Sequence, residues 1–397
     1  MNFKFYNDTD TDNLIGMVPF FINGTDFNHD DSVKPYLTND INEAEYFCTH
    51  IDSVGPQRFI EALNIILKIR ESRDVTWIIE CKDEIITISE WDIIESFRDK
   101  FPRNKLLLLS AELKKEVSDD IIESFPDYLI PYQYLHHNRS LIPFSFLELP
   151  EESIPSKTKK ILSSARKYNP CRDSFYKIFL KNEGESKYMN EFNEFRYFGV
   201  TAKENLAETE TTKYFKQNYH TNHDFKKIKS DRMMWSEGEY YHELLEEYSN
   251  YFFSIVHETA PKDTFSDNPP RFLPDNLYPN NRFGLQMGEK TMLPMTSKGI
   301  FFVNSYSGIE KYLQKIGIET FSDIFNINYD EFSIDRRSKK MLEVVDIINN
   351  MSITDITNLY NREDIQEKIQ KNYNYIIYHR NKDNCRKDHF EYLKKLL

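Results

Sequence analysis

An acid and a base stand side by side at Glu289 and Lys290, in front of a segment of helix length that leads to Gly299. The apolar run 300–303 follows and is typical of a buried strand. A helix N-terminus beside a parallel strand attracts phosphate, because its first N–H groups lack partners and its dipole end is positive. Lys290 would add a full charge, and Glu289 could accept hydrogen bonds from both hydroxyls of a ribose. The alternative interpretation is a solvated charge pair at the start of an ordinary helix.

Two upstream segments carry further side chains of the same kind. The apolar run 251–257 ends in an acidic tip at Glu258. Residues 159–166 predict a strand, and a polar turn then leads into a helix with Arg172 in its first turn. A planar guanidinium matches the oxygens of a phosphate, so the candidates to face one are Ser164, Arg166 and Arg172. As ordinary structure, the two arginines would be surface side chains.

Taken in order, these segments resemble the nucleotide-sugar domain of the fucosyltransferase-like glycosyltransferases, and more closely a group of related phage and giant-virus glycosyltransferases. In that pattern a strand–turn–arginine–helix unit comes first and a strand ending in an acid comes second. A Glu-Lys pair opening a helix comes third, followed by a proline, a glycine and an apolar strand, here Pro294, Gly299 and residues 300–303. The resemblance covers roughly residues 157–345, whereas the first 150 residues hold no matching motif.

The resemblance implies two Rossmann-like domains that face a cleft, the GT-B-like architecture, with a nucleotide-sugar donor held by the second domain. Lys290 and Arg172 would neutralise the diphosphate, and Glu289 would hold the ribose. Glu258 would contact the donor sugar or order the site. A carboxylate of the first domain would deprotonate the acceptor hydroxyl, which gives an inverting transfer. No metal is expected, because the two fixed cations would take its place.

The first part of the chain alternates between helix and strand patterns from residue 56 onward. An amphipathic helix is predicted over 59–69, buried strands over 75–80 and 105–110, helices from Ser89 and Ser118, and a strand over 128–135. This alternation favours a parallel sheet with covering helices. Ligands bind such sheets at the carboxyl ends of the strands, where the candidates are Glu80, Ser110, Glu112, His136 and His137.

Glu80 is the predicted catalytic base, because it ends an apolar strand and partial burial makes a carboxylate more basic. Its alternative role is to cap a helix or to form an ion pair. The neighbours His136 and His137 could ligate a metal, but no third ligand is evident. The Asp-x-Asp pattern within 8–12 could also hold a cation, and a solvated tail is the preferred interpretation there.

Three regions are expected from these patterns. Residues 1–150 form the acceptor-side domain, and the proline-containing stretch 138–158 links it to the nucleotide-sugar domain at 151–350. Residues 351–397 are helical, with one apolar face made by Ile365, Ile369, Tyr373 and Ile376. The resemblance implies that these last helices cross back onto the first domain.

The net charge of −13 argues against a surface built to bind nucleic acid. One stretch, 213–232, is locally basic and interleaved with aromatics, which can suit single-stranded nucleic acid. An alternative function is therefore the glycosylation of hydroxymethylated bases in viral DNA, although an exposed insert is the preferred interpretation of that stretch. A third alternative is a non-catalytic descendant of the fold that binds a nucleotide or a partner protein.

The four cysteines, at 48, 81, 171 and 385, are far apart and form no Cys-x-x-Cys pair. No zinc site is therefore expected, and a reducing compartment is the natural environment. The N-terminus lacks the apolar run of a signal peptide, and no stretch approaches the roughly 20 apolar residues of a membrane span. The sequence predicts a cytoplasmic glycosyltransferase, in the host cytoplasm if viral, that transfers a sugar from a nucleotide sugar to a glycan or small-molecule hydroxyl.

Overall fold

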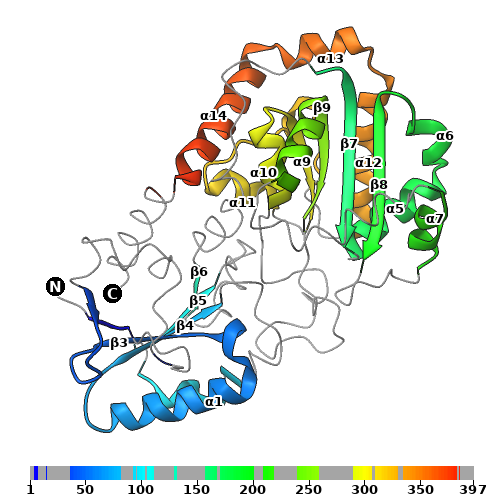
Figure 1. The fold of residues 1–397 in the computed structure, drawn as a ribbon. Helices are drawn as coiled ribbons and strands as arrows, with labels where there is room; N and C mark the ends of the chain where they lie inside the picture. The colour runs from blue at the N-terminus through cyan, green and yellow to red at the C-terminus, as the bar shows by residue number, and fades with distance from the viewer. Residues whose placement is uncertain are drawn as a thin grey trace. The chain divides into compact units, whose positions relative to one another are not determined.

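A computed structural model describes a little over half of the chain. The described residues are 4–7, 15, 36–81, 93–94, 96–102, 105–110, 129–131, 157–167, 170–200, 209–218, 239–258, 289–305, 309–329, 334–381 and 384. They form two compact units, each built around its own sheet (Figure 1). Every strand pair in both sheets is parallel. The predicted α/β class with parallel sheets is confirmed, and the cleft between domains stays a prediction.

The first unit holds a six-stranded sheet in the order β2-β1-β3-β4-β5-β6. Its elements are β1 (Phe5–Tyr6), β2 (Leu37–Thr38), β3 (Tyr46–His50), α1 (Ile51–Arg70), β4 (Thr76–Cys81), η3 (Arg98–Lys100), β5 (Leu106–Ser110) and β6 (Leu129–Pro131). The predicted helix at 59–69 is part of α1, and the predicted strands at 75–80, 105–110 and 128–135 are β4, β5 and β6. The predicted helix from Ser118 lies outside the described residues.

An aromatic cluster packs α1 onto this sheet. Phe59 of α1 stacks on Trp77 of β4 with ring centroids 5.3 Å apart, and Phe97 and Phe101 close the cluster. The indole of Trp77 also donates a hydrogen bond of 3.0 Å to Thr49 Oγ1, so its buried N–H is paired. Trp77 and Thr49 therefore point to the α1 face, and the alternate residues of β3 and β4 point to the opposite face.

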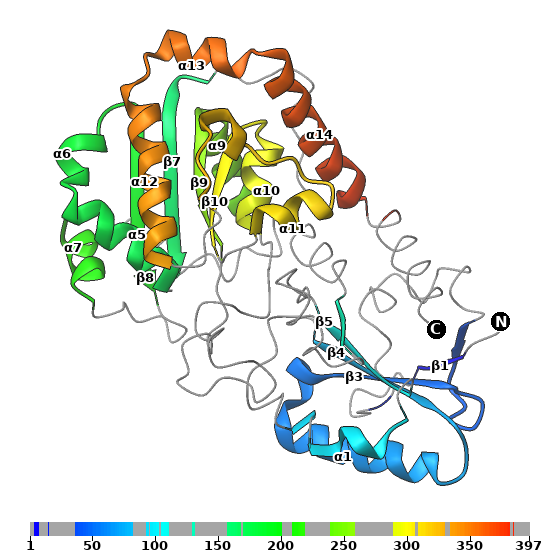
Figure 2. The same cartoon turned by 180° about the vertical axis from the view of Figure 1, so that it is seen from behind.

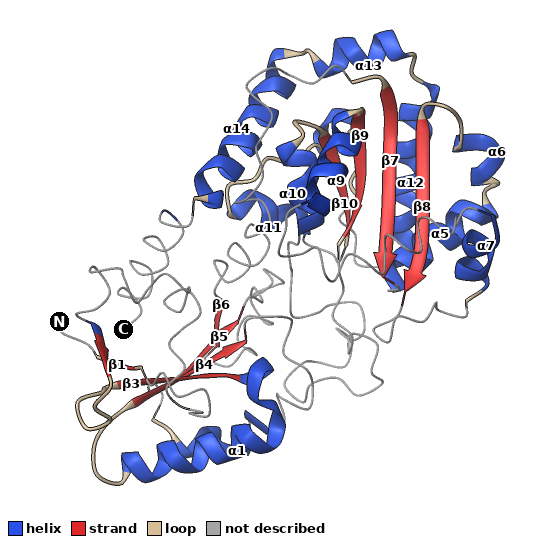
Figure 3. Ribbon diagram, viewed as in Figure 1, coloured by secondary structure: helices blue, strands red, loops and turns tan. Residues whose placement is uncertain are grey.

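The second unit holds a four-stranded sheet in the order β10-β9-β7-β8. The strands are β7 (Lys159–Lys167), β8 (Asn193–Val200), β9 (Tyr251–His257) and β10 (Ile300–Asn304), and their arrows point the same way in Figure 3. The helices are α5 (Pro170–Lys181), α6 (Gly184–Tyr188), α7 (Glu210–Asn218), α9 (Glu239–Ser249), α10 (Glu289–Thr296), α11 (Ile309–Lys315), η5 (Ser322–Phe325), α12 (Ile334–Asn350), α13 (Ile353–Tyr360) and α14 (Glu363–Arg380).

The chain reverses its winding direction at β7. It runs from β7 to β8 on one side, then returns to the other side of β7 for β9 and β10. Right-handed crossovers then place α5 on one face of the sheet and α9 and α10 on the other. Accordingly α5 packs against α12, while α9 packs against α10 (Figures 1 and 2). In such sheets the ligand crevice opens at the carboxyl ends of the two strands that flank the reversal, here β7 and β9.

Two lysines at the start of β7 hold three helix ends. Lys157 Nζ donates to the carbonyls of Ser249, at 3.2 Å, and of Ser297, at 3.0 Å, at the ends of α9 and α10. Lys160 Nζ donates to the carbonyls of Asn349, at 2.9 Å, and Met351, at 2.6 Å, at the end of α12. The last carbonyls of a helix lack partners within it and carry the negative end of the dipole, so both lysines stabilise these ends.

The segment after α12 is helical, as predicted. Ser352 caps α13 by a capping box with Asp355. The residues predicted to form the apolar face of α14, Ile365, Ile369, Tyr373 and Ile376, are buried, and α14 packs against α10 of the second unit. Among the residues after Asn381, the structure describes Asn384, so the predicted return to the first domain stays a prediction. Within the described residues, the helices are too short or too polar to cross a bilayer.

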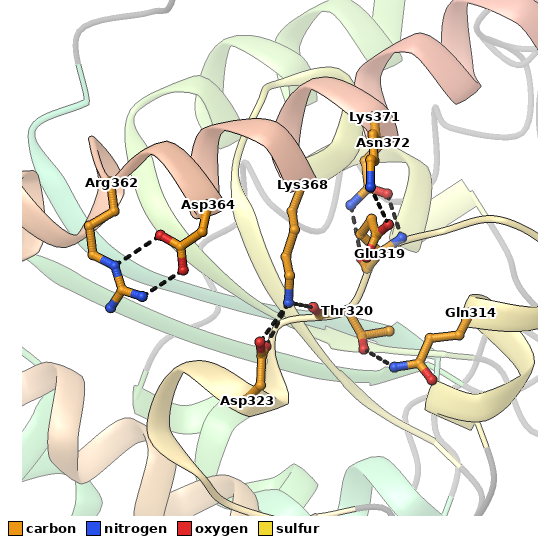
Figure 4. A network of polar contacts seen from close by, with 9 residues as sticks. All are labelled: Gln314, Glu319, Thr320, Asp323, Arg362, Asp364, Lys368, Lys371 and Asn372. Atoms are coloured by element: carbon orange, nitrogen blue, oxygen red, sulfur yellow. Dashed lines mark hydrogen bonds and ion pairs between the residues drawn. The ribbon is translucent and has the colours of Figure 1, made fainter.

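Polar contacts anchor α14 to the segment that follows α11 (Figure 4). The side-chain amide of Asn372 accepts a hydrogen bond of 2.8 Å from the Glu319 N–H and donates one of 2.9 Å to the Glu319 carbonyl. Lys368 Nζ lies 2.8 Å from Asp323 and 3.0 Å from the carbonyl of Thr320. The amide of Asn372 thus pairs with the backbone of Glu319 as a neighbouring strand would, which helps to fix the position of α14.

Candidate functional site at the carboxyl ends of β7 and β9

The imidazole of His257, the last residue of β9, ties together three strands and a helix. Its Nδ1 lies 3.1 Å from the amide nitrogen of Asn304 at the end of β10, and its Nε2 lies 2.9 Å from Ser163 Oγ on β7. Ser163 Oγ in turn lies 3.0 Å from the hydroxyl of Tyr176 on α5. The amide nitrogen can only donate, so Nδ1 accepts and Nε2 carries the ring proton that is donated to Ser163.

Burial keeps this imidazole neutral. Desolvation lowers the pKa of His257 well below its ordinary value, and the positive charges of Arg172 and Lys290 lower it further. A neutral ring is required by the hydrogen bonds it makes, since Nδ1 must offer a lone pair to Asn304. His257 therefore has a structural role, because its neutral ring links the ends of β7, β9 and β10.

Arg172 lies in the first turn of α5, which begins at Pro170 as expected for a proline at the first helical position. Its guanidinium donates two hydrogen bonds to the backbone carbonyl of His257, from Nε at 3.2 Å and from Nη2 at 2.8 Å. The side chain is fully buried. Two of its donors thus hold the end of β9, and the predicted contact of Arg172 with a phosphate stays a prediction.

Glu258 follows β9 directly and reaches the start of α10. Its Oε1 accepts a hydrogen bond of 3.2 Å from the backbone N–H of Thr291 and a shorter one from the Thr291 hydroxyl. The first N–H groups of a helix lack partners within the helix, and a carboxylate at this end also interacts favourably with the dipole. Glu258 therefore occupies part of the helix terminus at which the sequence predicted a phosphate.

The structure brings together the three separated segments of the prediction. Arg172 holds the carbonyl of His257, Glu258 is the next residue, and its partner Thr291 is the next residue after Lys290. Lys290 is half-buried, and its positive charge helps to lower the pKa of His257. Arg172 and Lys290 both act electrostatically on the His257 ring, so two positive charges lie near the end of β9. Positive charge at this position suits an anionic ligand.

The other predicted residues of this edge lie on the same elements. Ser164 is on β7 and half-buried, Arg166 is also in β7, and Glu289 is the first residue of α10, as predicted. The sequence pointed to Ser164, whereas the serine that contacts His257 is its neighbour Ser163. The sequence pattern also did not identify Thr291 as the partner of Glu258. Its position directly after the Glu-Lys pair, in the first turn of α10, could have suggested that role.

Comparisons with known proteins add one structural likeness. The chain is similar to the crystal structure of an α1,3-fucosyltransferase at 12% sequence identity and a TM-score of 0.29, over 83% of this chain and 89% of the other. No family model matches the chain. No curated protein matches it either.

In the first unit, the predicted base Glu80 is wholly enclosed. It lies in β4 with no exposed surface, and its Oε2 is 3.0 Å from His50 Nε2. A general base must lie within hydrogen-bonding reach of the proton that it removes, and an enclosed carboxylate does not meet an acceptor hydroxyl. The predicted role of Glu80 as the base stays a prediction, and it would require this enclosure to open to the acceptor. Ser110 ends β5, whereas Glu112, His136, His137 and the Asp-x-Asp stretch lie outside the described residues.

The basic stretch 213–232 is described only as far as residue 218, the end of α7. Lys213 is exposed and lies 3.5 Å from Glu210 on the same helix, an ordinary surface pair. Phe215 is fully buried and packs against Tyr176, with ring centroids 5.0 Å apart. This aromatic belongs to the core, which removes one of the side chains proposed to stack on nucleic acid bases.

Proposed function

We propose that the chain is a glycosyltransferase whose nucleotide-sugar donor binds at the carboxyl ends of β7 and β9, with a glycan or small-molecule hydroxyl as acceptor. The observation that carries the proposal is the meeting of Arg172, Glu258 and the Lys290 segment where the sheet reverses direction. The three segments also resemble, in order, the motifs of the fucosyltransferase-like glycosyltransferases. Two independent arguments, the motif order and the topology of the sheet, therefore point to one edge.

In this proposal Lys290 contacts the diphosphate directly. It is the half-exposed cation at the start of α10, next to a helix dipole that favours negative charge. Negative charge builds on the nucleotide as the sugar leaves, and a cation fixed beforehand at that position stabilises the transition state. Glu289, the adjacent first residue of α10, would accept hydrogen bonds from the ribose hydroxyls.

Arg172 and Glu258 act as positioning residues in this scheme. The guanidinium fixes the carbonyl of His257, and the carboxylate one residue later fixes the N-terminus of α10 through Thr291. These contacts hold Lys290 where the diphosphate would bind. Pre-positioned charge needs no reorganisation when the reaction occurs, so disturbing either contact should weaken catalysis without removing a group that touches the donor.

The test is donor binding and turnover with Lys290→Ala. A panel of nucleoside diphosphates and nucleotide sugars is screened by thermal shift, because a ligand that binds the folded state raises the melting temperature with its occupancy. Titration calorimetry and nucleotide release then follow with the best ligand. We expect Lys290→Ala to lose binding and turnover, while Lys339→Ala, an exposed lysine on α12 across the sheet, behaves like the parent chain.

Two outcomes would overturn the proposal. One is a panel in which no nucleotide raises the melting temperature of the parent protein. The other is unchanged donor turnover in a Lys290→Ala variant that is folded by circular dichroism.

A further inference from the structure

We propose that Cys48, His50 and Glu80 in the first unit bind a divalent transition-metal cation of the zinc class. One ligand atom from each side chain, the thiol sulfur, an imidazole nitrogen and a carboxylate oxygen, lies within 4.8 Å of the other two. All three side chains are buried, with exposed fractions of 1%, 3% and 0%. The site lies in a different unit from the donor site, so the proposal does not depend on the proposed function.

Strand pairing accounts for the meeting of these residues. Cys48 and His50 are two apart on β3 and share the face of the sheet that points away from α1. β3 and β4 pair in parallel with His50 opposite Glu80, so the carboxylate points to the same face. His50 also occupies the N-cap position of α1, with an extended backbone at φ −91° and ψ 107° and no capping hydrogen bond from its side chain. Two paired strands and a helix start thus hold all three side chains, as a preorganised site requires.

The separation of His50 and Glu80 is close to the one that a tetrahedral ion demands. Bond lengths of about 2.0–2.3 Å to oxygen, nitrogen and sulfur place neighbouring ligand atoms about 3.3–3.6 Å apart. His50 Nε2 and Glu80 Oε2 are 3.0 Å apart, so these two atoms need to separate by only about 0.4 Å.

The chemistry of the donors selects the class of cation. Mg²⁺ and Ca²⁺ take oxygen ligands, whereas a set of sulfur, nitrogen and oxygen suits Zn²⁺ and its transition-metal neighbours. A thiolate, a carboxylate and a neutral imidazole carry two negative charges together, which balance a divalent cation in a buried place. Without an ion, the same pocket holds a buried His–Glu pair beside a thiol, which is the competing interpretation.

Three protein ligands leave a fourth position for water or another group, as in catalytic zinc sites. The sequence argument against zinc rested on the absence of a Cys-x-x-Cys pair. It did not consider a site made of one cysteine, one histidine and one glutamate from two strands. The location at the carboxyl ends of β3 and β4 is the edge at which a parallel sheet binds its ligands.

The experiment uses the full chain and metal alone as the probe. Protein purified without chelator is assayed for metal content, and the stripped protein is titrated with Co²⁺ and followed by absorption. We expect close to one ion per chain and a thiolate-to-cobalt charge-transfer band. Cys48→Ser should remove that band, and His50→Ala and Glu80→Gln should each weaken binding by more than the roughly 10–100-fold typical of outer-shell changes.

Cys171→Ser, in the second unit on α5, is the matched control and should retain the full cobalt spectrum. Near-isosteric Cys48→Ser guards against simple unfolding, and circular dichroism checks each variant. The proposal is overturned if the stripped, folded chain gains no charge-transfer band with Co²⁺, or if Cys48→Ser leaves the band unchanged. A melting temperature that rises with added Zn²⁺ in the parent and not in Glu80→Gln would support it.

Discussion

The guanidinium of Arg172 and the carbonyl of His257 are joined by two hydrogen bonds, from Nε at 3.2 Å and from Nη2 at 2.8 Å. This pair connects the helix after β7 to the end of β9, the two strands between which the sheet reverses direction. Glu258 comes next in the chain and caps α10 through Thr291. A short series of contacts that begins at one buried arginine therefore connects α5, β9 and α10.

Replacing Arg172 should reduce both stability and donor binding. Arg172→Met removes both hydrogen bonds and leaves the His257 carbonyl buried without them, which costs about 1–3 kcal/mol of unfolding free energy. Arg172→Lys keeps the charge but not the planar fork, and we expect it to recover part of the stability. Urea unfolding measures both variants. Equal stability of Arg172→Met and the parent would contradict the role assigned to this contact.

Thr291 offers a second test, because its hydroxyl and its backbone N–H both donate to Glu258. Thr291→Val removes only the hydroxyl, and a hydrogen bond to a charged group contributes about 1.5–3 kcal/mol. We expect a loss of that order in unfolding free energy and weaker nucleotide binding through a less fixed Lys290. Thr291→Ser keeps the hydroxyl and is the matched control. Indistinguishable valine and serine variants in both assays would refute the arrangement.

The sequence predicted the elements of this edge well for a physical reason. The runs at β9 and β10 are largely apolar stretches, as expected for strands covered on both faces, and polar residues mark where each run ends. The start of α10 at Glu289 follows from the same pattern. These features depend on neighbours in the chain, so local reasoning finds them.

The partners of the charged residues could not be predicted in the same way. Glu258 meets Thr291 from 33 positions away, and Arg172 turns inward to a carbonyl 85 positions away. Both contacts depend on the order of strands in the sheet and on which face each helix covers. For the same reason the short strand β3 was missed, and with it the meeting of Cys48 and His50 with Glu80.

His257 should make stability depend on pH below neutrality. Its folded pKa lies well below the 6.5 of the unfolded chain, so below pH 6.5 the unfolded chain binds a proton that the folded chain refuses. The unfolding free energy therefore falls as the pH drops, with a contribution of up to about 1.4 kcal/mol per pH unit from this one group. Urea titrations between pH 7 and about 5 measure it.

His257→Gln removes the titrating ring and should therefore weaken the pH dependence of the unfolding free energy between pH 7 and about 5. This holds even if the variant is less stable than the parent at every pH. Other titrating groups contribute equally to parent and variant, so the difference between the two curves isolates His257. Parallel curves over this range would show that the ring charges readily in the folded state, contrary to its burial beside Arg172 and Lys290.

Lys157 should make the unfolding free energy depend on pH above neutrality. Burial lowers the pKa of this ammonium from 10.5 to about 7, so between these values the unfolded chain holds a proton that the folded chain has released. The unfolding free energy should therefore rise with pH above about 7, by up to about 1.4 kcal/mol per unit from this group. Below pH 7 the folded chain carries the full cost of a charge held in a buried place, which its two helix-end carbonyls offset in part.

Lys157→Met should flatten the rise in unfolding free energy between pH 7 and about 9, a range below the ordinary tyrosine pKa. Lys181→Met changes an exposed lysine of α5 and should leave the rise intact. A Lys157→Met profile that runs parallel to the parent would mean that Lys157 stays charged in the folded protein and that the carbonyls of Ser249 and Ser297 compensate its burial completely.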